Sequence, residues 1–320
     1  MRHYLLSAAL AAFVAVPAAH ADETWPNRTV TIIAPFAPGG IIDIASRIVG
    51  DALSERWGVS VVVENRAGGS GFIGAQAAAQ ADPDGYTLLA AEAGISLINE
   101  LVFPSVPYSM MEDFVPITTM SDTPIVLAAN AGLGISTVAE FIDLARAEEQ
   151  DYSAVATASL NHLTGEWMAI EADLQFSHVP YRGGAPSAQA LAAGEVPFGI
   201  LAYSSVLPYV QTGDVVIIAT TSAERIAADP DLPSLQEGGI ANIDTSQWAA
   251  LYARAGTDPA IVERLHRDVY EVLNDPDVQA RFASVGARTI PQSREDFIAH
   301  LDRQREELRR IVELAGVTVN

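Results

Sequence analysis

The feature of the sequence that most limits its fold is the alternation of short apolar runs with longer helical ones. TVTIIAPF (29–36), SVVVENR (60–66) and YTLLAAE (86–92) have the length and composition of buried strands. The segment 41–57 is amphipathic, and 67–81 runs from a glycine-rich loop into an alanine-rich helix. Strands that alternate with helices in this way predict an α/β protein with largely parallel strands.

The same pattern starts again in the middle of the chain. A helix capped by Ser136 or Thr137 is expected there, and further helices follow later strands. A loop-like stretch, a strand at 248–256 and three helices complete the chain. Two α/β units, crossed more than once by the chain, predict two lobes with a cleft between them, the layout of hinge-closing binding proteins. The strands expected in the middle block lie at 124–130, 152–158, 175–184, 195–203 and 215–222.

The N-terminus has the pattern of a secretory signal. Residues 1–21 combine a short basic start, an apolar run from Leu5 to Val16 and an A-x-A cleavage site ending at Ala21. The alternative is an uncleaved membrane anchor, for which the apolar run is short. The chain has no cysteine, which excludes disulfides, thiol catalysis and a lipid-modified cysteine. We therefore expect the mature protein to begin at residue 22 and to be free in the periplasm.

The charge balance excludes two classes of partner. The net charge is −22, and all eighteen basic residues are arginine. A surface of this kind repels nucleic acid and anionic membranes. Any anion that the protein binds must therefore be attracted by local dipoles.

A glycine-rich turn, Pro38-Gly39-Gly40, stands at the start of the first predicted helix. Glycine lets backbone N–H groups approach a ligand, and a helix N-terminus carries about half a positive charge. The turn is therefore a candidate carboxylate, sulfate or phosphate site; the alternative is a tight turn with no ligand. This turn matches neither nucleotide-binding motif, since it lacks the pattern G-x-G-x-x-G and the chain has no lysine for a P-loop. We expect Asp43 to orient this loop rather than to act as a base.

Two other loops repeat this arrangement. Residues 67–71 follow the second predicted strand, and Ala156-Thr157-Ala158-Ser159 follow a strand of the middle block. In open α/β sheets, ligands bind beyond the carboxyl ends of strands. The recurrence of the loops at equivalent points favours a binding site over three unrelated turns.

The sequence offers little for catalysis. It has no G-x-S-x-G elbow and no H-E-x-x-H motif. His162 and Glu166 are four residues apart, which is half of a metal site at most, and His178 is expected to be structural. We predict no catalytic residue, no metal and no cofactor.

At the level of motifs, the chain resembles the Bug family, the extracytoplasmic solute receptors of tripartite tricarboxylate transporters. The matching segments are WPNRTVTIIAPFAPGGIIDIASR, VVVENRAGGSGFIGAQAAAQADPDGYTLL, NHLTGE, HVPYRGGAPSAQALAAGEV, LPYVQTG and WAALYARAGTDPAIVERL. The resemblance implies a type II-like periplasmic binding protein in which each lobe is a mostly parallel sheet flanked by helices. It implies one domain from 22–121 with 236–320, and a second from 122–235.

The resemblance also indicates which residues bind the ligand. The family's first binding loop corresponds to Phe36–Asp43, and its second to Ala156–His162, where alanines replace the glycines of the usual G-N-G-T-S-Q-H-L. Arg182 stands where the family commonly has lysine, and it is a candidate for a bidentate bond to a carboxylate. The complete set of expected ligand-binding residues is Phe36, Ala37, Pro38, Gly39, Gly40, Asp43, Gly94, Ser96, Ala156, Thr157, Ser159, Asn161, His162, Tyr181, Arg182, Tyr203 and Ser204.

We therefore expect a monomeric periplasmic receptor that captures a small organic carboxylate, with a di- or tricarboxylate favoured. Its expected partners are that ligand and the membrane permease of a tripartite tricarboxylate transporter. Two alternatives stay open: a receptor for an aromatic or monocarboxylic acid, which an apolar wall from Phe36, Phe72 or Tyr203 would favour, and a sensor that presents its ligand to a membrane kinase.

Overall fold

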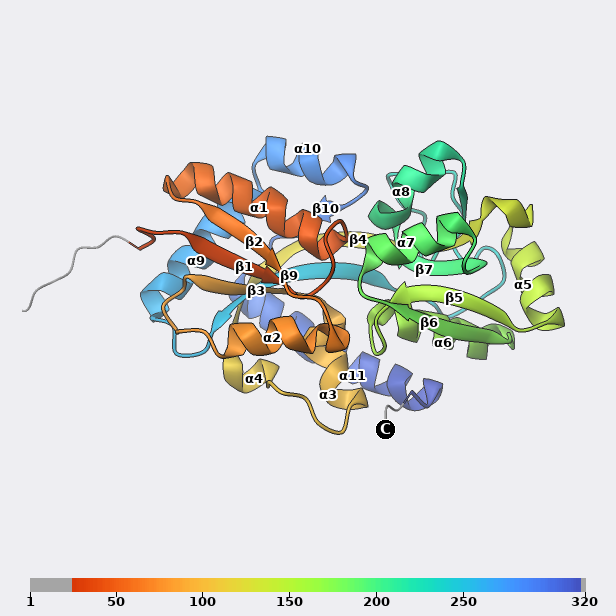
Figure 1. The fold of residues 1–320 in the computed structure, drawn as a ribbon, viewed down its shortest axis with the longest axis horizontal. Helices are drawn as coiled ribbons and strands as arrows, with labels where there is room; N and C mark the ends of the chain where they lie inside the picture. The colour runs from red at the N-terminus through yellow and green to blue at the C-terminus, as the bar shows by residue number, and fades with distance from the viewer. Residues whose placement is uncertain (1–24, 318–320) are drawn as a thin grey trace, which may run out of the picture.

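The computed structural model describes residues 25–317 and shows a mixed α/β protein with two lobes (Figure 1). One lobe contains β1 to β3 and the other β5 to β7, while β4 and β9 run between them. The strands form one curled sheet in the order β2-β1-β3-β9-β4-β7-β5-β6, with β8 and β10 also paired to β4. This confirms the predicted fold class. The predicted signal peptide lies outside the described residues, and no helix within 25–317 is long and apolar enough to cross a membrane.

The first lobe consists of parallel strands joined by helices. β1 (Val30–Ala34) pairs in parallel with β2 (Val61–Asn65) and with β3 (Thr87–Ala91). α1 (Ile41–Trp57) has the bounds that its amphipathic pattern predicts, and it ends at Gly58 in the left-handed conformation, with φ 69°. The shorter helices are η1 (Gly69–Gly71), α2 (Phe72–Ala79), η2 (Gly94–Ile98), α3 (Asn99–Val102) and α4 (Met110–Asp113).

The second lobe repeats the arrangement. β5 (Gln150–Val155) pairs in parallel with β6 (Phe176–Tyr181) and β7 (Phe198–Ala202). The helix α8 was not predicted: the sequence pattern ended a strand at Tyr203, where this helix begins. The other elements of this lobe are η3 (Ala131–Leu133), α5 (Val138–Ala147), α6 (Leu160–Ala172), α7 (Gly184–Ala193), α8 (Tyr203–Thr212) and β8 (Val215–Thr220).

Two long strands join the lobes. β4 (Phe114–Asn130) pairs with β9 (Ser246–Arg254) in its first half and with β7 and β8 in its second half, in each case antiparallel. The sequence pattern predicted a strand only from 124, because the first half of β4 contains many hydroxyl side chains. Those side chains have distant partners: Thr118 Oγ1 donates to the carbonyl oxygen of Gln292 at 2.9 Å. The domain boundaries at 121/122 and 235/236 stay a prediction, since β4 passes through the first of them unbroken.

The C-terminal segment forms α9 (Pro259–Leu273), α10 (Pro276–Ser284), β10 (Arg288–Thr289) and α11 (Arg294–Ala315). The helices α9 and α10 contact α1 of the first lobe, while α11 contacts η2 of the first lobe and α6 of the second. Asp258 and Asp275 cap α9 and α10, each with a proline in the first turn, as the two Asp-Pro pairs indicate. Trp248 on β9 donates its Nε1 hydrogen to Gln304 on α11 at 2.6 Å, which fixes this helix against the strands that join the lobes.

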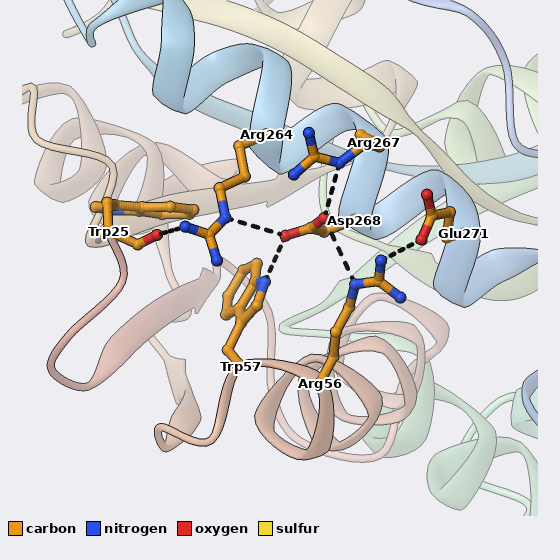
Figure 2. Close-up of polar contacts among 7 residues, drawn as sticks. All are labelled: Trp25, Arg56, Trp57, Arg264, Arg267, Asp268 and Glu271. Carbon is orange, nitrogen blue, oxygen red and sulfur yellow. Dashed lines mark hydrogen bonds and ion pairs between the residues drawn. The ribbon is translucent and has the colours of Figure 1, made fainter.

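A buried carboxylate connects α9 to α1 (Figure 2). Asp268 is 3% exposed and accepts a hydrogen bond of 2.7 Å from Trp57 Nε1. Three guanidinium groups, of Arg56, Arg264 and Arg267, lie 3.3–3.5 Å from its oxygens. The network extends to Glu271, which pairs with Arg56, and to the carbonyl group of Trp25, which accepts from Arg264. Asp268 therefore neutralises cations from two helices in one place.

Loss of this carboxylate is expected to weaken the first lobe. Asp268→Ala leaves three arginines facing one another and leaves Trp57 Nε1 without its acceptor, so it should lower the free energy of unfolding by about 2–4 kcal/mol. Asp302→Ala is the control, because its ion pair with Arg305 is exposed and worth about 0.5 kcal/mol or less. Urea unfolding of both variants measures the difference; equal midpoints would contradict the role given to Asp268.

Candidate ligand-binding cleft

Three helix N-termini without side-chain caps meet between the lobes. α1, α7 and α8 begin after Gly40, Gly183 and Ala202, and none of these residues accepts a side-chain hydrogen bond from its helix. Thr137 caps α5 and Ser293 caps α11 with their side chains, whereas the short helices α2 and α3 also lack a side-chain cap. The first N–H groups of α1, α7 and α8 are therefore available to a ligand from outside the helix.

The loops of the two lobes are in direct contact at this point. Ala37 N donates to the carbonyl oxygen of Arg182 at 3.0 Å. A methyl group on Gly183 would stand 3.1 Å from Ala37 N, and one on Gly40 would stand 3.4 Å from Gly184 N. The pair Gly183-Gly184 thus lets the second lobe approach the first loop, a role that the sequence alone did not reveal.

A small cavity lies beneath this contact, with a volume of about 10 Å³. Two buried side chains that line it have an oxygen atom without a hydrogen-bond partner: Ser205 Oγ and Gln247 Oε1. The neighbouring Ser204 Oγ is also unpartnered. Unpaired buried oxygens of this kind are rare in native proteins and require an explanation. The residues around the cavity are Phe36, Gly40, Ile41, Ile42, Val155, Gly184, Ala202, Ser205 and Gln247.

A larger cleft of about 370 Å³ lies on the other side of Phe36, which lines both spaces. Arg182 is the charged residue among those that line it, and within residues 25–317 no hydrogen bond or ion pair engages its guanidinium group. Five predicted site residues therefore meet here, together with the second glycine-rich loop. The lining consists of Phe36, residues 67–71, Ile73, Ala156, Thr157, Pro180, Tyr181 and Arg182.

Asp43 has the orienting position that was expected. Its carboxylate accepts from Gly39 N at 2.9 Å and from Asn65 Nδ2 at 2.9 Å, and it lies 2.8 Å from Arg47 Nη2. Burial raises the pKa of Asp43, but the hydrogen bonds from Arg47, Gly39 and Asn65 outweigh it and hold the pKa below its usual value. Asn65 also donates to the carbonyl oxygen of Phe36, so these residues fix the shape of the loop.

The loop before α6 satisfies most of its own polar groups. Ser159 Oγ accepts from His162 N at 3.1 Å, and His162 Nδ1 accepts from Ala158 N at 3.2 Å. Ala156 and Ala158 have φ of 44° and 63°, a left-handed conformation that costs alanine about 1 kcal/mol. Asn161 is fully buried, and neither its Oδ1 nor its Nδ2 has a partner. Of these residues, Asn161 is the side chain with unused hydrogen-bonding capacity.

His162 shows no sign of metal binding. Its ring stacks on His178 with centroids 4.1 Å apart, and burial and the neighbouring His162 lower the pKa of His178 to about 3. Glu166, 3.6 Å from His162 Nε2, accepts from Tyr152 Oη. The described part of the chain contains no cluster of three potential metal ligands.

The remaining predicted site residues lie apart from the two cavities. Ser96 Oγ accepts from Tyr252 Oη at 3.0 Å inside the first lobe. The ring of Tyr203 packs against Gly286, which lies on the turn before β10. Burial raises the pKa of the Tyr203 hydroxyl group. Gly94 lies beside the carbonyl oxygen of Ala158. A Cβ atom added to Gly94 would stand 3.2 Å from that oxygen. Gln247, by contrast, was missed, because no local pattern distinguishes a polar residue at the start of a buried strand.

Next to Gly94 lies a buried acid that forms no ion pair with any residue in the described part of the chain. Glu92 is 1% exposed and accepts from Gly94 N at 2.7 Å and from Ile95 N at 3.2 Å. Burial raises its pKa to about 7, although these two hydrogen bonds act in the opposite direction. The folded protein therefore holds a proton on Glu92 at a pH where the unfolded chain has lost it.

Glu92 should make the stability of the protein depend on pH. The contribution of protonated Glu92 to the free energy of unfolding is fully present below about pH 4.5. It is lost as the pH rises to about 7, and the total loss is up to roughly 3 kcal/mol. The side chain of Glu92→Gln cannot ionise. The free energy of unfolding of this variant should therefore rise relative to that of wild type between pH 5 and pH 8. Urea unfolding at several pH values measures this, with the exposed Glu313→Gln as control; parallel pH profiles of wild type and Glu92→Gln would contradict it.

Comparisons with known proteins agree with this geometry. The family described as "Tripartite tricarboxylate transporter family receptor" matches residues 45–317. The protein BugT of Bordetella pertussis is 34% identical, over 87% of this chain and 87% of its own length. These matches confirm the predicted family, and its description as a receptor agrees with the prediction that the chain is not an enzyme.

Two solved structures are also similar. Rpa4515 of R. palustris, solved with adipate, is 30% identical with a TM-score of 0.89, and the match covers 92% of this chain and 99% of that one. MatC of Rhodopseudomonas palustris, solved with malate, is 25% identical with a TM-score of 0.84, and the match covers 90% and 100%. By sequence and by fold, this chain therefore belongs to the receptors of the tripartite tricarboxylate transporter family.

Proposed function

We propose that this protein is a periplasmic receptor that captures a small organic carboxylate, with a di- or tricarboxylate favoured, and delivers it to the permease of a tripartite tricarboxylate transporter. The observation that carries the proposal is the meeting of the uncapped N-termini of α1, α7 and α8 at buried, unpartnered oxygens. A carboxylate there accepts N–H hydrogen bonds and interacts with three positive dipole ends. The adipate and malate in the two similar structures are acids of this class.

A second carboxylate is accommodated by the larger cleft. Arg182 offers a fork of donors at its edge, and Thr157 offers a hydroxyl group. Phe36 lies between the two spaces, so a ligand of a few carbons can extend from one to the other past this ring. A carboxylate is larger than the small cavity, and its binding therefore requires the lobes to stand slightly further apart than they do here.

The proposal includes delivery as well as capture. Closure of the lobes buries the ligand, and the closed form of a monomeric receptor is the one that a permease distinguishes from the open form. Export by the signal at 1–21 brings the receptor to the periplasm. Presentation of the ligand to a membrane kinase uses the same closure, and binding measurements with permease and kinase domains would separate the two.

A receptor for an aromatic acid is the weaker alternative. It needs an apolar wall, for which Phe36, Phe72 and Tyr203 were the candidates. Phe36 lines the cavities, but the Phe72 ring packs on Phe103 at 4.9 Å between centroids, and Tyr203 packs on Gly286. One aromatic ring among the three supports this alternative, together with Tyr181 at the edge of the larger cleft.

A thermal-shift screen of residues 22–320 against mono-, di-, tricarboxylates and aromatic acids tests the proposal. At one hundred times its dissociation constant, a ligand should stabilise the protein by about 2.7 kcal/mol, several degrees in melting temperature. The screen is repeated after unfolding and refolding, which removes any acid retained from the cell. No shift from any acid in the refolded protein would contradict the carboxylate proposal.

Two variants locate the site with whichever acid shifts the melting temperature. Gly40→Leu places a side chain between the lobes at the start of α1, so affinity should fall by about a hundredfold or more with little change in the melting temperature of the protein alone. Thr137→Ala is the opposite control: it removes the cap of α5 and should cost about 1 kcal/mol of stability with unchanged affinity. Equal affinity in Gly40→Leu and wild type would place the ligand elsewhere.

A further inference from the structure

Glu92 of the first lobe lies close to a loop of the second. Its carboxyl group accepts from Gly94 N at 2.7 Å and from Ile95 N at 3.2 Å. Gly94 faces the loop before α6: a Cβ atom added to it would stand 3.2 Å from the carbonyl oxygen of Ala158 and 3.2 Å from Glu92 Cδ. The carboxyl group of Glu92 and the carbonyl group of Ala158 therefore lie on the same side of Gly94, which has no side chain to separate them.

The two groups have complementary hydrogen-bonding needs. Ala158 is 1% exposed, and within residues 25–317 no hydrogen bond is donated to its carbonyl oxygen. A buried carbonyl group without a donor is uncommon and unfavourable. On the other lobe, burial favours the neutral form of Glu92, which carries a hydrogen. The neutral carboxyl group is a donor, and the Ala158 carbonyl oxygen is an acceptor that lacks one.

The hydrogen bonds within the first lobe indicate which carboxyl oxygen carries the hydrogen. Glu92 Oε2 accepts the shorter bond, from Gly94 N, and Oε1 accepts the longer one, from Ile95 N. Oε1 is also the atom with which a Cβ atom on Gly94 would collide, so it is the oxygen on the side of Ala158. A protonated carboxyl group carries its hydrogen on one oxygen, and Oε1 has the weaker acceptor bond to lose.

We propose that Glu92 is a proton-binding site of the lobe interface, whose neutral carboxyl group donates a hydrogen bond to the carbonyl oxygen of Ala158 and so holds the lobes together. Loss of the proton leaves two acceptor oxygens facing each other, one of them charged, and favours separation of the lobes. The inference goes beyond the proposed function, because it concerns the contact between the lobes and holds for whichever acid binds.

Two tyrosines face Glu92 from within the first lobe. Burial raises the pKa of Tyr108 and of Tyr252 above the usual value, and the charge of Glu92 acts in the same direction, so both phenols stay neutral. Each hydroxyl group already donates a hydrogen bond of 3.0 Å, Tyr108 to the carbonyl oxygen of Ile95 and Tyr252 to Ser96 Oγ. These side chains surround the carboxyl group without adding a charge that titrates near neutral pH.

The charged groups near this contact lie one step further away. The charge of Glu100 acts on Tyr108 and that of Arg305 on Tyr252, and neither forms an ion pair with Glu92 among the residues described. In the second lobe, His162 Nδ1 accepts from Ala158 N at 3.2 Å, and Glu166 lies 3.6 Å from His162 Nε2. His162 therefore stands behind Ala158, and an experiment has to separate its titration from that of Glu92.

The direction of the pH dependence follows from the pKa of Glu92. With the lobes in contact, burial raises this pKa from 4.5 to about 7. Separation of the lobes admits water and removes the Ala158 acceptor, so the pKa falls back toward 4.5. The closed form is therefore favoured at low pH, and this advantage is lost as the pH rises through about 7. Each pKa unit between the two forms changes their ratio about tenfold.

The separation of the lobes as a function of pH tests the inference without any ligand. The chain has no cysteine, so Val62→Cys on β2 and Ile170→Cys on α6, both at exposed positions, accept a pair of fluorophores for energy transfer. In the protein that is otherwise wild type, the ratio of closed to open molecules should rise about tenfold between pH 8.5 and pH 5.5.

Three variants of the labelled protein assign the effect. Glu92→Gln keeps a donor at every pH, so its ratio should stay near the wild-type value at pH 5.5. Glu92→Leu has no donor, so its ratio should stay at or below the wild-type value at pH 8.5. Glu100→Gln is the matched control, because it removes an exposed carboxylate of the same lobe, and it should keep the wild-type profile. If Glu92→Gln melts at a lower temperature than wild type, Glu92→Asp, whose shorter side chain draws the carboxyl group back from Ala158, replaces it and should lose the pH dependence.

Each result supports or overturns the inference. A wild-type ratio that does not change with pH would overturn it. An unchanged pH dependence in Glu92→Gln or Glu92→Asp would also overturn it and assign the effect to another group, such as His162. Equal ratios in Glu92→Gln and Glu92→Leu would show that the donor has no part in closure. Because no acid is added, these outcomes are independent of the carboxylate screen that tests the proposed function.

Discussion

The cleft depends on one constraint, the sharing of β4 between the two lobes. Its first half pairs with β9 beside β3, and its second half pairs with β7 and β8. Ile125 on this strand lies opposite Ala202, the residue from which α8 begins. The start of α8, Gln247 on β9 and the first loop are therefore brought together by the strand register, and the loops complete a site whose place the sheet has already fixed.

The parts of the fold that follow local rules were predictable. The amphipathic run of α1 gave its bounds, and the Asp-Pro pairs gave the starts of α9 and α10. The first half of β4 was not, because hydroxyl residues such as Thr118 and Thr119 weaken the apolar signal and their acceptors lie some 170 positions away, near Gln292 and Ile290. Tertiary pairing decides such a segment, and a single sequence carries no record of it.

The site divides in the same way. Gly40 precedes α1 and Asp43 lies in its first turn, and the glycines with the helix behind them predicted an anion-binding role for this segment, to which the family resemblance added Phe36. Gln247 lines the small cavity from a strand in another part of the chain, so only the topology reveals its place there. The predicted ligand-binding role of Ser159 and His162 stays a prediction, and the structure shows that their side chains also hydrogen-bond within their own loop.

The net charge of −22 repels an acid at long range, so the proposed ligand has to be attracted by neutral polar groups close to it. Backbone N–H groups and uncharged side chains attract a carboxylate over short distances only, and here they come from both lobes. Arg182 lines the larger cleft, and none of the described residues around the small cavity is a cation, so the proposed ligand is not held to one lobe by a buried positive charge. Separation of the lobes then removes α1 from α7 and α8 at once. Under the proposed function, capture and release consequently depend on the same movement, which is the property that a receptor needs if it is to release its ligand.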